Sequence, residues 1–379
     1  MFKFVQRFMQ RESASGIVLG LAAVLAMVVA NSAASAWYFE VFSTRLGPWT
    51  LTTWINDVLM AIFFFVVGME IKYELVDGAL ASRERATLPI VAALGGMIAP
   101  ALIYTAFNHG SEFESGWGVP MATDIAFAVG ALTMLGKRVS TALKVFLLAL
   151  AIADDLGAVL VIAIFYSSGV KLVSLGLAVG IAGLIWWLAK KSVRYVPLHI
   201  ALGASLWFLV HESGIHATVA GCVLGFLMPH ADSTPDDPTP LERWVERLHP
   251  FVGFAIMPIF AFANAGLVFK DFALDEAIRN HVVLGVGLGL VVGKAFGIYG
   301  ACWLAESFGI ARRSDGITRA QLFGAACLGG IGFTMALFVS QLAFSDRGAI
   351  EFAKIGIVFG SLASASIGTA VLASTSRAR

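Results

Sequence analysis

The chain has 379 residues, of which 58% are hydrophobic and only 13% are charged, and its formal net charge is +1. Soluble proteins average about 25% charged residues, so this composition favours a chain whose flanks are covered by lipid. A net charge near zero excludes a basic surface for nucleic acid. The three cysteines, Cys222, Cys302 and Cys327, lie in apolar stretches without metal-ligand spacing. We expect them to be buried thiols.

The N-terminal segment is similar to a secretory signal. Basic residues precede an apolar run at 16–30, and Ala34-Ser35-Ala36 resembles a cleavage site. Because nearly everything downstream is also apolar, we interpret residues 13–31 as a retained first membrane helix. Residues 2–9 alternate apolar and basic groups, which predicts a short interfacial helix before this span.

Apolar stretches of membrane-spanning length recur through the rest of the chain. A helix needs about 20 mostly apolar residues to cross the hydrocarbon. We therefore predict an all-α polytopic membrane protein, one domain over residues 1–379. The twelve predicted transmembrane helices are 13–31, 54–76, 87–107, 118–136, 142–167, 171–189, 196–211, 214–229, 250–269, 281–304, 320–343 and 350–373.

Two connections carry features of their own. Residues 37–53 alternate aromatic and polar groups around Gly47-Pro48, which predicts a small β-hairpin outside the membrane. Residues 230–249 are proline-rich at first and then amphipathic, and we predict a cytoplasmic loop there. With a cytoplasmic N-terminus, 19 of the 26 lysines and arginines lie on the cytoplasmic side and six on the outer side. This bias predicts that both termini are cytoplasmic and that the hairpin is periplasmic.

Two adjacent carboxylates interrupt one span. Asp154 and Asp155 lie between the apolar runs 145–153 and 156–165. An ionisable group at the bilayer centre costs roughly 2.5–3.5 kcal/mol on insertion scales, so the pair requires a partner or a wet cavity. Consecutive helical residues point about 100° apart. One carboxylate can therefore face a cavity while the other faces a neighbouring helix. A helix cap in a misjudged loop is the alternative interpretation.

Lys294 is the basic residue deepest in a predicted span, within Leu290-Val-Val-Gly-Lys-Ala-Phe-Gly297. A buried ammonium group requires a carboxylate, and one aspartate of the pair at 154–155 is the expected partner. The alternative is a lysine whose ammonium group extends to the cytoplasmic interface. Ten residues separate Lys294 from Leu304 at the end of the span, which favours the buried interpretation.

Two spans, one in each half of the chain, carry helix-breaking residues. Asp124 follows Pro120, which cannot donate a helical hydrogen bond, and the span at 320–343 contains Gly329-Gly330-Ile331-Gly332. Non-helical backbone at membrane depth is tolerated only within protein or along a wet cavity. Paired interrupted spans are typical of a transporter's binding site. Glycines used for close helix packing are the alternative.

These residues together predict a site for a small hard cation. Asp154, Asp155, Asp124 and Thr123 offer oxygen ligands, which suit Na⁺ or Li⁺ better than a soft metal. The same carboxylates bind protons, so protons and the cation compete for one site. Alternating exposure of such a site to the two sides makes the competition an exchange. The chain contains no nucleotide-binding loop, so we expect an ion gradient to supply the energy.

Five motifs in order through the chain resemble the NhaA family of sodium/proton antiporters. They are Ala122-Thr123-Asp124-Ile125-Ala126-Phe127, Ala153-Asp154-Asp155-Leu156-Gly157-Ala158, Phe260-Ala261-Phe262-Ala263-Asn264-Ala265-Gly266, Gly293-Lys294 and Gly330-Ile331-Gly332-Phe333-Thr334-Met335. The resemblance implies an inverted-repeat fold with two discontinuous helices crossing near the membrane midplane. Pro120, Gly330 and Gly332 would shape their broken backbone.

The resemblance also implies roles for the charged residues. Asp155 would be the main ligand of Na⁺ or Li⁺, and Asp154 would pair with Lys294 until cation and proton exchange. Asp124 would lie against the positive ends of the half-helices, and Lys294 against the negative ends. Exchange of two external protons for one cytoplasmic Na⁺ would be electrogenic, and no cofactor is expected. The hairpin at 37–53 would form the contact of a homodimer in the bacterial inner membrane.

Activation at alkaline pH is a further implication of the resemblance. Glu70 in Gly68-Met-Glu-Ile-Lys72 and His216 in Gly214-Ile-His-Ala-Thr218 match positions linked to that response. Glu70 could instead be an interfacial charge paired with a nearby basic residue, and His216 a packed helix histidine.

Two other functions fit these residues less well than antiport. A sodium-coupled symporter of an organic anion would require an added basic pocket, and Lys294 is the one cation that we predict to be buried. An intramembrane enzyme is the more remote rival. An aspartyl protease would typically contain Gly-x-Gly-Asp, which the chain lacks, and Asp154-Asp155 is followed by Leu156-Gly157-Ala158 rather than the Asp-Asp-x-x-Asp of a prenyltransferase. We therefore expect a transporter and not an enzyme.

Overall fold

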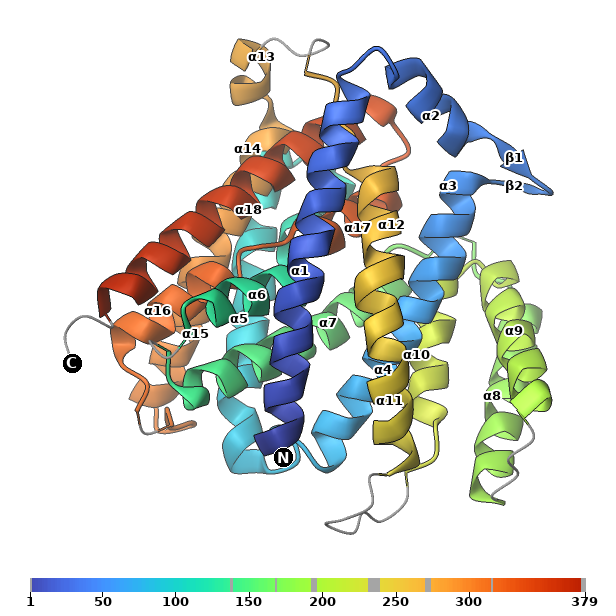
Figure 1. Cartoon of the computed structure of the whole chain (residues 1–379), viewed down its shortest axis with the longest axis horizontal. Coiled ribbons are helices and arrows are strands. Elements are labelled where there is room, and N and C mark those ends of the chain that lie inside the picture. Colours follow the sequence, from blue (N-terminus) through green and yellow to red (C-terminus); the bar gives the residue numbers. More distant parts are fainter. Residues whose placement is uncertain are drawn as a thin grey trace.

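The computed structural model describes residues 2–136, 139–167, 169–191, 196–230, 239–269, 274–314 and 316–375, with the side chains of 2–13, 196, 274 and 276 left aside. Long helices stand side by side, as Figure 1 shows. In chain order the first half contains α1 (Phe2–Ala30), α2 (Ser35–Ser43), β1 (Arg45–Leu46), β2 (Trp49–Thr50), α3 (Leu51–Thr53), the π-helical η1 (Trp54–Leu59), α4 (Met60–Val76), α5 (Arg83–Asn108), the 3₁₀ helix η2 (Glu114–Met121), α6 (Ile125–Met134) and α7 (Thr141–Phe165).

The second half is also helical in the part that the structure describes. It contains α8 (Leu172–Lys190), α9 (Val196–Glu212), α10 (Ala217–Leu227), α11 (Pro240–Phe251), the π-helical η4 (Val252–Ile256), α12 (Met257–Asn264), α13 (Leu274–Arg279), α14 (His281–Leu288), the π-helical η6 (Gly289–Gly293), α15 (Lys294–Ser307), α16 (Arg319–Leu328), α17 (Phe333–Ala343) and α18 (Arg347–Thr375).

The membrane-spanning elements match the prediction of a polytopic all-α protein. Among the described residues, eight helices are long and apolar enough to cross a membrane, and two bent pairs raise the number to ten. The shorter helices α9 and α10 overlap the other two predicted spans. The chain is therefore an all-α polytopic membrane protein with a small two-stranded antiparallel sheet, in which Arg45 pairs with Thr50.

Three local expectations differ from the structure. Residues 37–43 belong to α2, so the predicted hairpin over 37–53 is reduced to β1 and β2. The N-terminal segment is one continuous helix, α1, rather than a short helix before a span. The amphipathic end of the 230–249 loop is α11, which continues through η4 into α12. Residues 231–238 of that loop lie outside the described residues.

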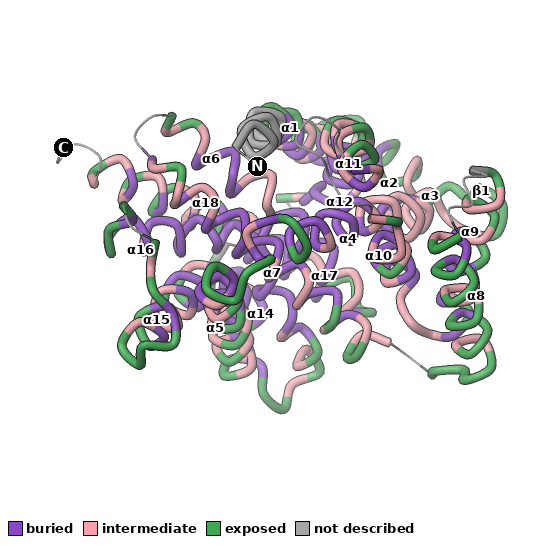
Figure 2. Tube along the Cα trace, turned by 90° about the horizontal axis from the view of Figure 1, so that it is seen from below, coloured by how far each residue is buried: buried purple, intermediate pink, exposed green. Residues whose placement is uncertain are grey.

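Packing divides the helices into central and peripheral ones. The apolar window of α7 is 72% buried, whereas that of α8 is only 17% buried. Figure 2 shows buried residues gathered on α4, α7 and α17, with the more exposed α8 and α9 at one edge. The two adjacent aspartates therefore lie on one of the most enclosed helices of the molecule. Cys222, Cys302 and Cys327 are buried free thiols, as expected.

Small residues allow α4 and α10 to pack with their backbones close together. A Cβ atom at Gly221 of α10 would overlap the carbonyl oxygen of Ala61, and one at Gly68 of α4 would overlap the carbonyl oxygen of Cys222. Close backbone approach through small residues is a common basis of helix association in membranes. In contrast, a Cβ atom at Gly180 of α8 would have no heavy atom within 4 Å.

We expect Gly221→Ala to destabilise the protein, because the added methyl group forces α4 and α10 apart. The cost of such overpacking is about 1–3 kcal/mol, visible as a lower melting temperature of the purified protein in detergent. Gly180→Ala is the matched control and should melt no lower than the parent. Equal melting temperatures of parent and Gly221→Ala would contradict this packing.

Candidate functional site

Two broken spans meet at the centre of the molecule. The 3₁₀ helix η2 is followed by the extended residues 122–124 and then α6, while α16 and α17 are joined by residues 329–332 with a bend of 48°. The interruption of the first span thus follows Pro120, which lies inside η2. Two cross-links join the breaks: the Asp124 N–H donates to the Ile331 carbonyl at 2.6 Å, and the Thr123 hydroxyl donates to the Gly329 carbonyl at 2.7 Å.

The glycines of the second break make this crossing possible. A Cβ atom at Gly332 would lie 2.9 Å from the carbonyl oxygen of Ala122, and one at Gly330 would overlap the carbonyl oxygen of Leu290. Both distances are shorter than ordinary van der Waals contact. The backbone of the second break therefore touches the first break on one side and the π-helical segment before Lys294 on the other.

Asp124 caps the two half-helices that leave the crossing. Its Oδ1 accepts the Phe127 N–H at 3.2 Å, in the first turn of α6, and its Oδ2 accepts the Thr334 N–H at 3.0 Å, in the first turn of α17. The Thr334 hydroxyl also donates to Oδ2. Helix N-termini carry partial positive charge, so a buried carboxylate is stabilised at this position. Asp124 is only 1% exposed.

Asp154 and Lys294 form a buried ion pair. Lys294 Nζ lies 2.6 Å from Asp154 Oδ2, and both side chains are 1% exposed. Lys294 directly follows η6, a π-helical turn. Such turns are frequent at functional sites. Breaking a pair of this kind by removing one partner leaves an uncompensated charge and costs about 3–5 kcal/mol.

Asp155, the other carboxylate of the pair, faces a cavity. The cavity has a volume of about 50 Å³, more than the ~10–15 Å³ that one water requires. Its polar lining comes from Ser15, Glu70, Asp124, Asp155 and His249, and the rest of the lining is mainly apolar. Asp155 Oδ1 is buried and has no hydrogen-bond partner among the described residues. This oxygen is available to a cation or a proton that enters the cavity.

The two candidate pH-responsive residues lie in different places. Glu70 lines the cavity, 3.9 Å from His249 Nε2 of α11. His216 instead precedes α10, where its Nδ1 contacts the Thr218 hydroxyl at 2.8 Å and its Nε2 lies 3.6 Å from Asp57. The structure therefore brings Glu70, but not His216, together with the central carboxylates.

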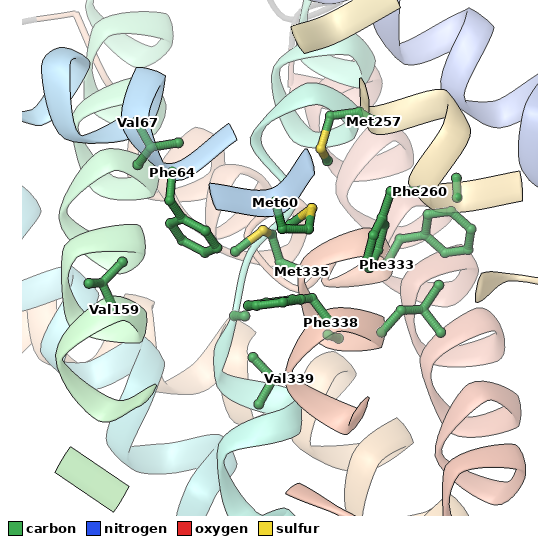
Figure 3. Packing of buried hydrophobic residues seen from close by; sticks show 14 of the residues in the cluster. Met60, Phe64, Val67, Val159, Met257, Phe260, Phe333, Met335, Phe338 and Val339 are labelled. Atoms are coloured by element: carbon green, nitrogen blue, oxygen red, sulfur yellow. The ribbon is translucent and has the colours of Figure 1, made fainter. Parts of the chain in front are cut away.

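An aromatic and methionine cluster lies between His216 and the cavity. Figure 3 shows Phe64, Phe260 and Phe338 converging beside Met60 and Met335. The Phe338 ring centroid is 5.5 Å from that of Phe64 and 6.2 Å from that of Phe260. The His216 ring contacts Phe338 at 5.6 Å, while Met335, one turn earlier on α17, lines the cavity. The cluster therefore contacts His216 through Phe338 and reaches the cavity through Met335.

Two polar residues of this site were not singled out by sequence reasoning. Thr334 is a hydroxyl residue in the first turn after a glycine-rich break, a position at which side chains commonly bind backbone or cap groups. His249 ends an amphipathic stretch and could equally be a surface residue by sequence alone. Neither pattern is specific enough to place these side chains beside a particular carboxylate.

Known proteins are similar to this chain over nearly its whole length. The family model described as Na+/H+ antiporter 1 matches residues 6–372. A Vibrio cholerae protein named Na(+)/H(+) antiporter NhaA is 44% identical over 375 residues, covering 98% of each chain. Proteins of the same name from Vibrio vulnificus and Aliivibrio fischeri are each 45% identical, over 367 and 372 residues; the alignments cover 96% and 97% of this chain and 94% and 97% of theirs.

The match covers both broken spans, the Asp154-Asp155 pair and Lys294, so it includes every element of the site described above. The chain belongs to the NhaA family of Na⁺/H⁺ antiporters.

Proposed function

We propose that the chain exchanges cytoplasmic Na⁺ or Li⁺ for external protons, with Asp155 as the main cation ligand. The observation that carries this assignment is that the two adjacent carboxylates have different surroundings. Each carboxylate has one buried oxygen without a hydrogen-bond partner among the described residues. However, Asp154 is neutralised by Lys294 at 2.6 Å, whereas Asp155 is the one of the two that lines the cavity. Asp155 is therefore the carboxylate that can change its ligand without first breaking an ion pair.

Competition at this site gives exchange rather than co-transport. With protons bound, Asp155 is neutral and the Asp154–Lys294 pair is neutral, so the site carries no net charge. A cation that binds between Asp155 and Asp154 displaces the Lys294 ammonium group, which gives up its proton. The site then holds two carboxylates, one monovalent cation and a neutral lysine, a net charge of −1. Two protons leave for each cation that binds, and the cycle is electrogenic.

Electrogenic exchange allows the membrane potential to drive cation export. Two protons enter and one cation leaves, so one net charge moves inward in each cycle. Moving one charge through 100 mV corresponds to about 2.3 kcal/mol. A negative interior therefore supports extrusion of Na⁺ even where the proton gradient alone is small, as at alkaline external pH.

Asp124 and Thr123 are secondary members of the proposed site. Asp124 lines the same cavity as Asp155 and can contribute an oxygen or a compensating charge. The Thr123 hydroxyl donates to the Gly329 carbonyl, but a hydroxyl that donates one bond still has oxygen lone pairs to offer a cation. We propose that the main role of Thr123 is to hold the two broken spans together at their crossing.

Regulation, assembly and orientation complete the proposal. Glu70 and His249 face each other at the cavity, where a change of charge would alter access for cations and support activation at alkaline pH. His216, paired with Asp57, would act from the other side of the apolar cluster.

The hairpin of β1 and β2 would form a homodimer contact, and both termini would lie in the cytoplasm of a bacterial cell.

The rival functions have less support from this geometry. A symporter of an organic anion would need a basic group to bind the anion, and Lys294 is engaged by Asp154. The described lining of the cavity contains no lysine or arginine. The site is therefore better suited to a small cation than to an anion or to an intramembrane reaction, and we propose no enzymatic activity.

Asp155→Asn should abolish Na⁺-dependent proton movement in everted membrane vesicles, because the amide neither carries the negative charge nor binds the exchanged proton. The measurement is the dequenching of a ΔpH-sensitive dye on addition of Na⁺. Glu212→Gln, which alters a partly exposed carboxylate outside the cavity, is the control and should retain exchange. Unchanged apparent Na⁺ affinity in Asp155→Asn would refute the assigned ligand.

Lys294→Ala should lower stability and remove charge movement. The uncompensated Asp154 carboxylate costs about 3–5 kcal/mol, which we expect to appear as a lower melting temperature in detergent. Without the lysine proton, exchange by the folded fraction of the variant should become electroneutral. We expect Na⁺ to drive no current in proteoliposomes adsorbed on a solid-supported membrane. Parent-like melting together with undiminished Na⁺-driven current would show that the Asp154 pairing has no part in transport.

A further inference from the structure

The side chain of Thr334 makes an unusual contact for a helical threonine in this chain. Threonine and serine hydroxyls in helices commonly donate to a carbonyl three or four residues earlier. Thr87, Thr133 and Ser340 do so, to Arg83, Val129 and Leu337. Thr334 instead donates across the crossing of the broken spans to Asp124 Oδ2. Its hydroxyl is therefore directed at a site residue rather than at its own helix.

The position of Thr334 allows this contact to orient the carboxylate. Thr334 is completely buried, in the first turn of α17, where the helix leaves its N–H groups unpaired. Its N–H and its hydroxyl both donate to the same oxygen of Asp124. Two donors on Oδ2, together with the Phe127 N–H on Oδ1, restrict rotation of the carboxylate about its Cβ–Cγ bond. Hydrogen bonds to an ionised group in a buried setting are roughly twice as strong as neutral ones.

The oriented carboxylate belongs to the cavity that Asp155 also lines. Charged groups from other elements also line it: Asp155 on α7, Glu70 on α4 and, when protonated, His249 on α11. The Asp154–Lys294 pair lies next to Asp155 but outside the lining. Thr334 itself does not line the cavity. Any influence of Thr334 on a bound cation must therefore pass through Asp124.

We propose that Thr334 is a positioning residue of the cation site, which holds the Asp124 carboxylate in the orientation it presents to the cavity and thereby sets the apparent affinity for Na⁺. This inference rests on the proposed function. A loosened Asp124 carboxylate would rotate between orientations, and each cation bound would have to stop that motion. Removal of the hydroxyl thus weakens cation binding without altering the exchange step itself.

The test is Na⁺ titration of proton exchange in proteoliposomes at fixed pH for the parent, Thr334→Val and Thr334→Ser. Valine has nearly the shape of threonine but lacks the hydroxyl. We expect the apparent KM of Thr334→Val for Na⁺ to rise about tenfold, the size expected for one hydrogen bond to a charged group, with kcat within about threefold of the parent. Thr334→Ser retains the hydroxyl and should restore KM to within about twofold of the parent.

Ser361→Ala separates positioning from simple stabilisation of α17. The Ser361 hydroxyl of α18 accepts the N–H of Phe333, the neighbour of Thr334, at 3.2 Å. Among the described residues Ser361 makes no hydrogen bond to Asp124. Its variant should lose stability while keeping the parent KM. If Thr334→Val does not fold, as judged by detergent melting, Thr334→Ala removes the same hydroxyl.

The positioning role would be overturned if the KM of the hydroxyl-free variant for Na⁺ were equal to or below that of the parent. It would also be overturned if the KM of Ser361→Ala rose as much as that of the hydroxyl-free variant. Absence of Na⁺-dependent proton flux in the parent would instead contradict the proposed function itself.

Discussion

Two side chains of opposite charge are buried together in the interior of this lipid-covered protein. Asp154 and Lys294 are both 1% exposed and 2.6 Å apart. Each would be strongly destabilising without the other, because desolvation of a single ion exceeds what nearby dipoles return. Asp155, one residue along the helix, has no such ionic partner in the part of the chain that the structure describes. The fold therefore stabilises one carboxylate with a lysine and places the adjacent one at a cavity.

The broken spans create a second electrostatic requirement at the same depth. Interrupting a helix within a membrane exposes unpaired N–H groups and partial positive charge at the new N-termini. Asp124 supplies both the hydrogen-bond acceptors and the negative charge, since its two oxygens accept the Phe127 and Thr334 N–H groups. Gly330 and Gly332 permit the close backbone contact between the breaks. The half-helices α6 and α17 are thus joined to one another through a residue that also lines the cavity beside Asp155.

Much of this arrangement was predictable because membrane burial restricts what a sequence can contain. Twenty-residue apolar stretches predicted the helices, and charges inside them predicted the pairing of Lys294 with the Asp154-Asp155 pair. The 100° step between consecutive helical residues predicted that the two aspartates face different surroundings. It did not decide which of them faces the cavity, and that assignment came from the family resemblance.

Features that depend on tertiary contacts were harder to predict. Residues 37–43 alternate aromatic and polar groups, a pattern that fits a strand, but Tyr38 and Phe42 are four residues apart and both pack on Phe262 at 5.4 and 5.9 Å between ring centroids. In a helix, residues four apart are neighbours on one face, close enough for both rings to pack on one side chain. In a strand they would share a face but lie about 13 Å apart. The separation of His216 from Glu70 by an aromatic cluster likewise follows from packing between distant segments, which no local pattern contains.

If protons and a cation take turns at Asp155, cation binding must release protons. Purified protein in weakly buffered detergent solution with a pH-indicator dye is titrated with NaCl, with choline chloride as the ionic-strength control. We expect saturable acidification approaching two protons per Na⁺ bound, and a Na⁺ affinity that weakens as the starting pH is lowered. Saturable Na⁺ binding with no proton release at any starting pH would contradict this alternation.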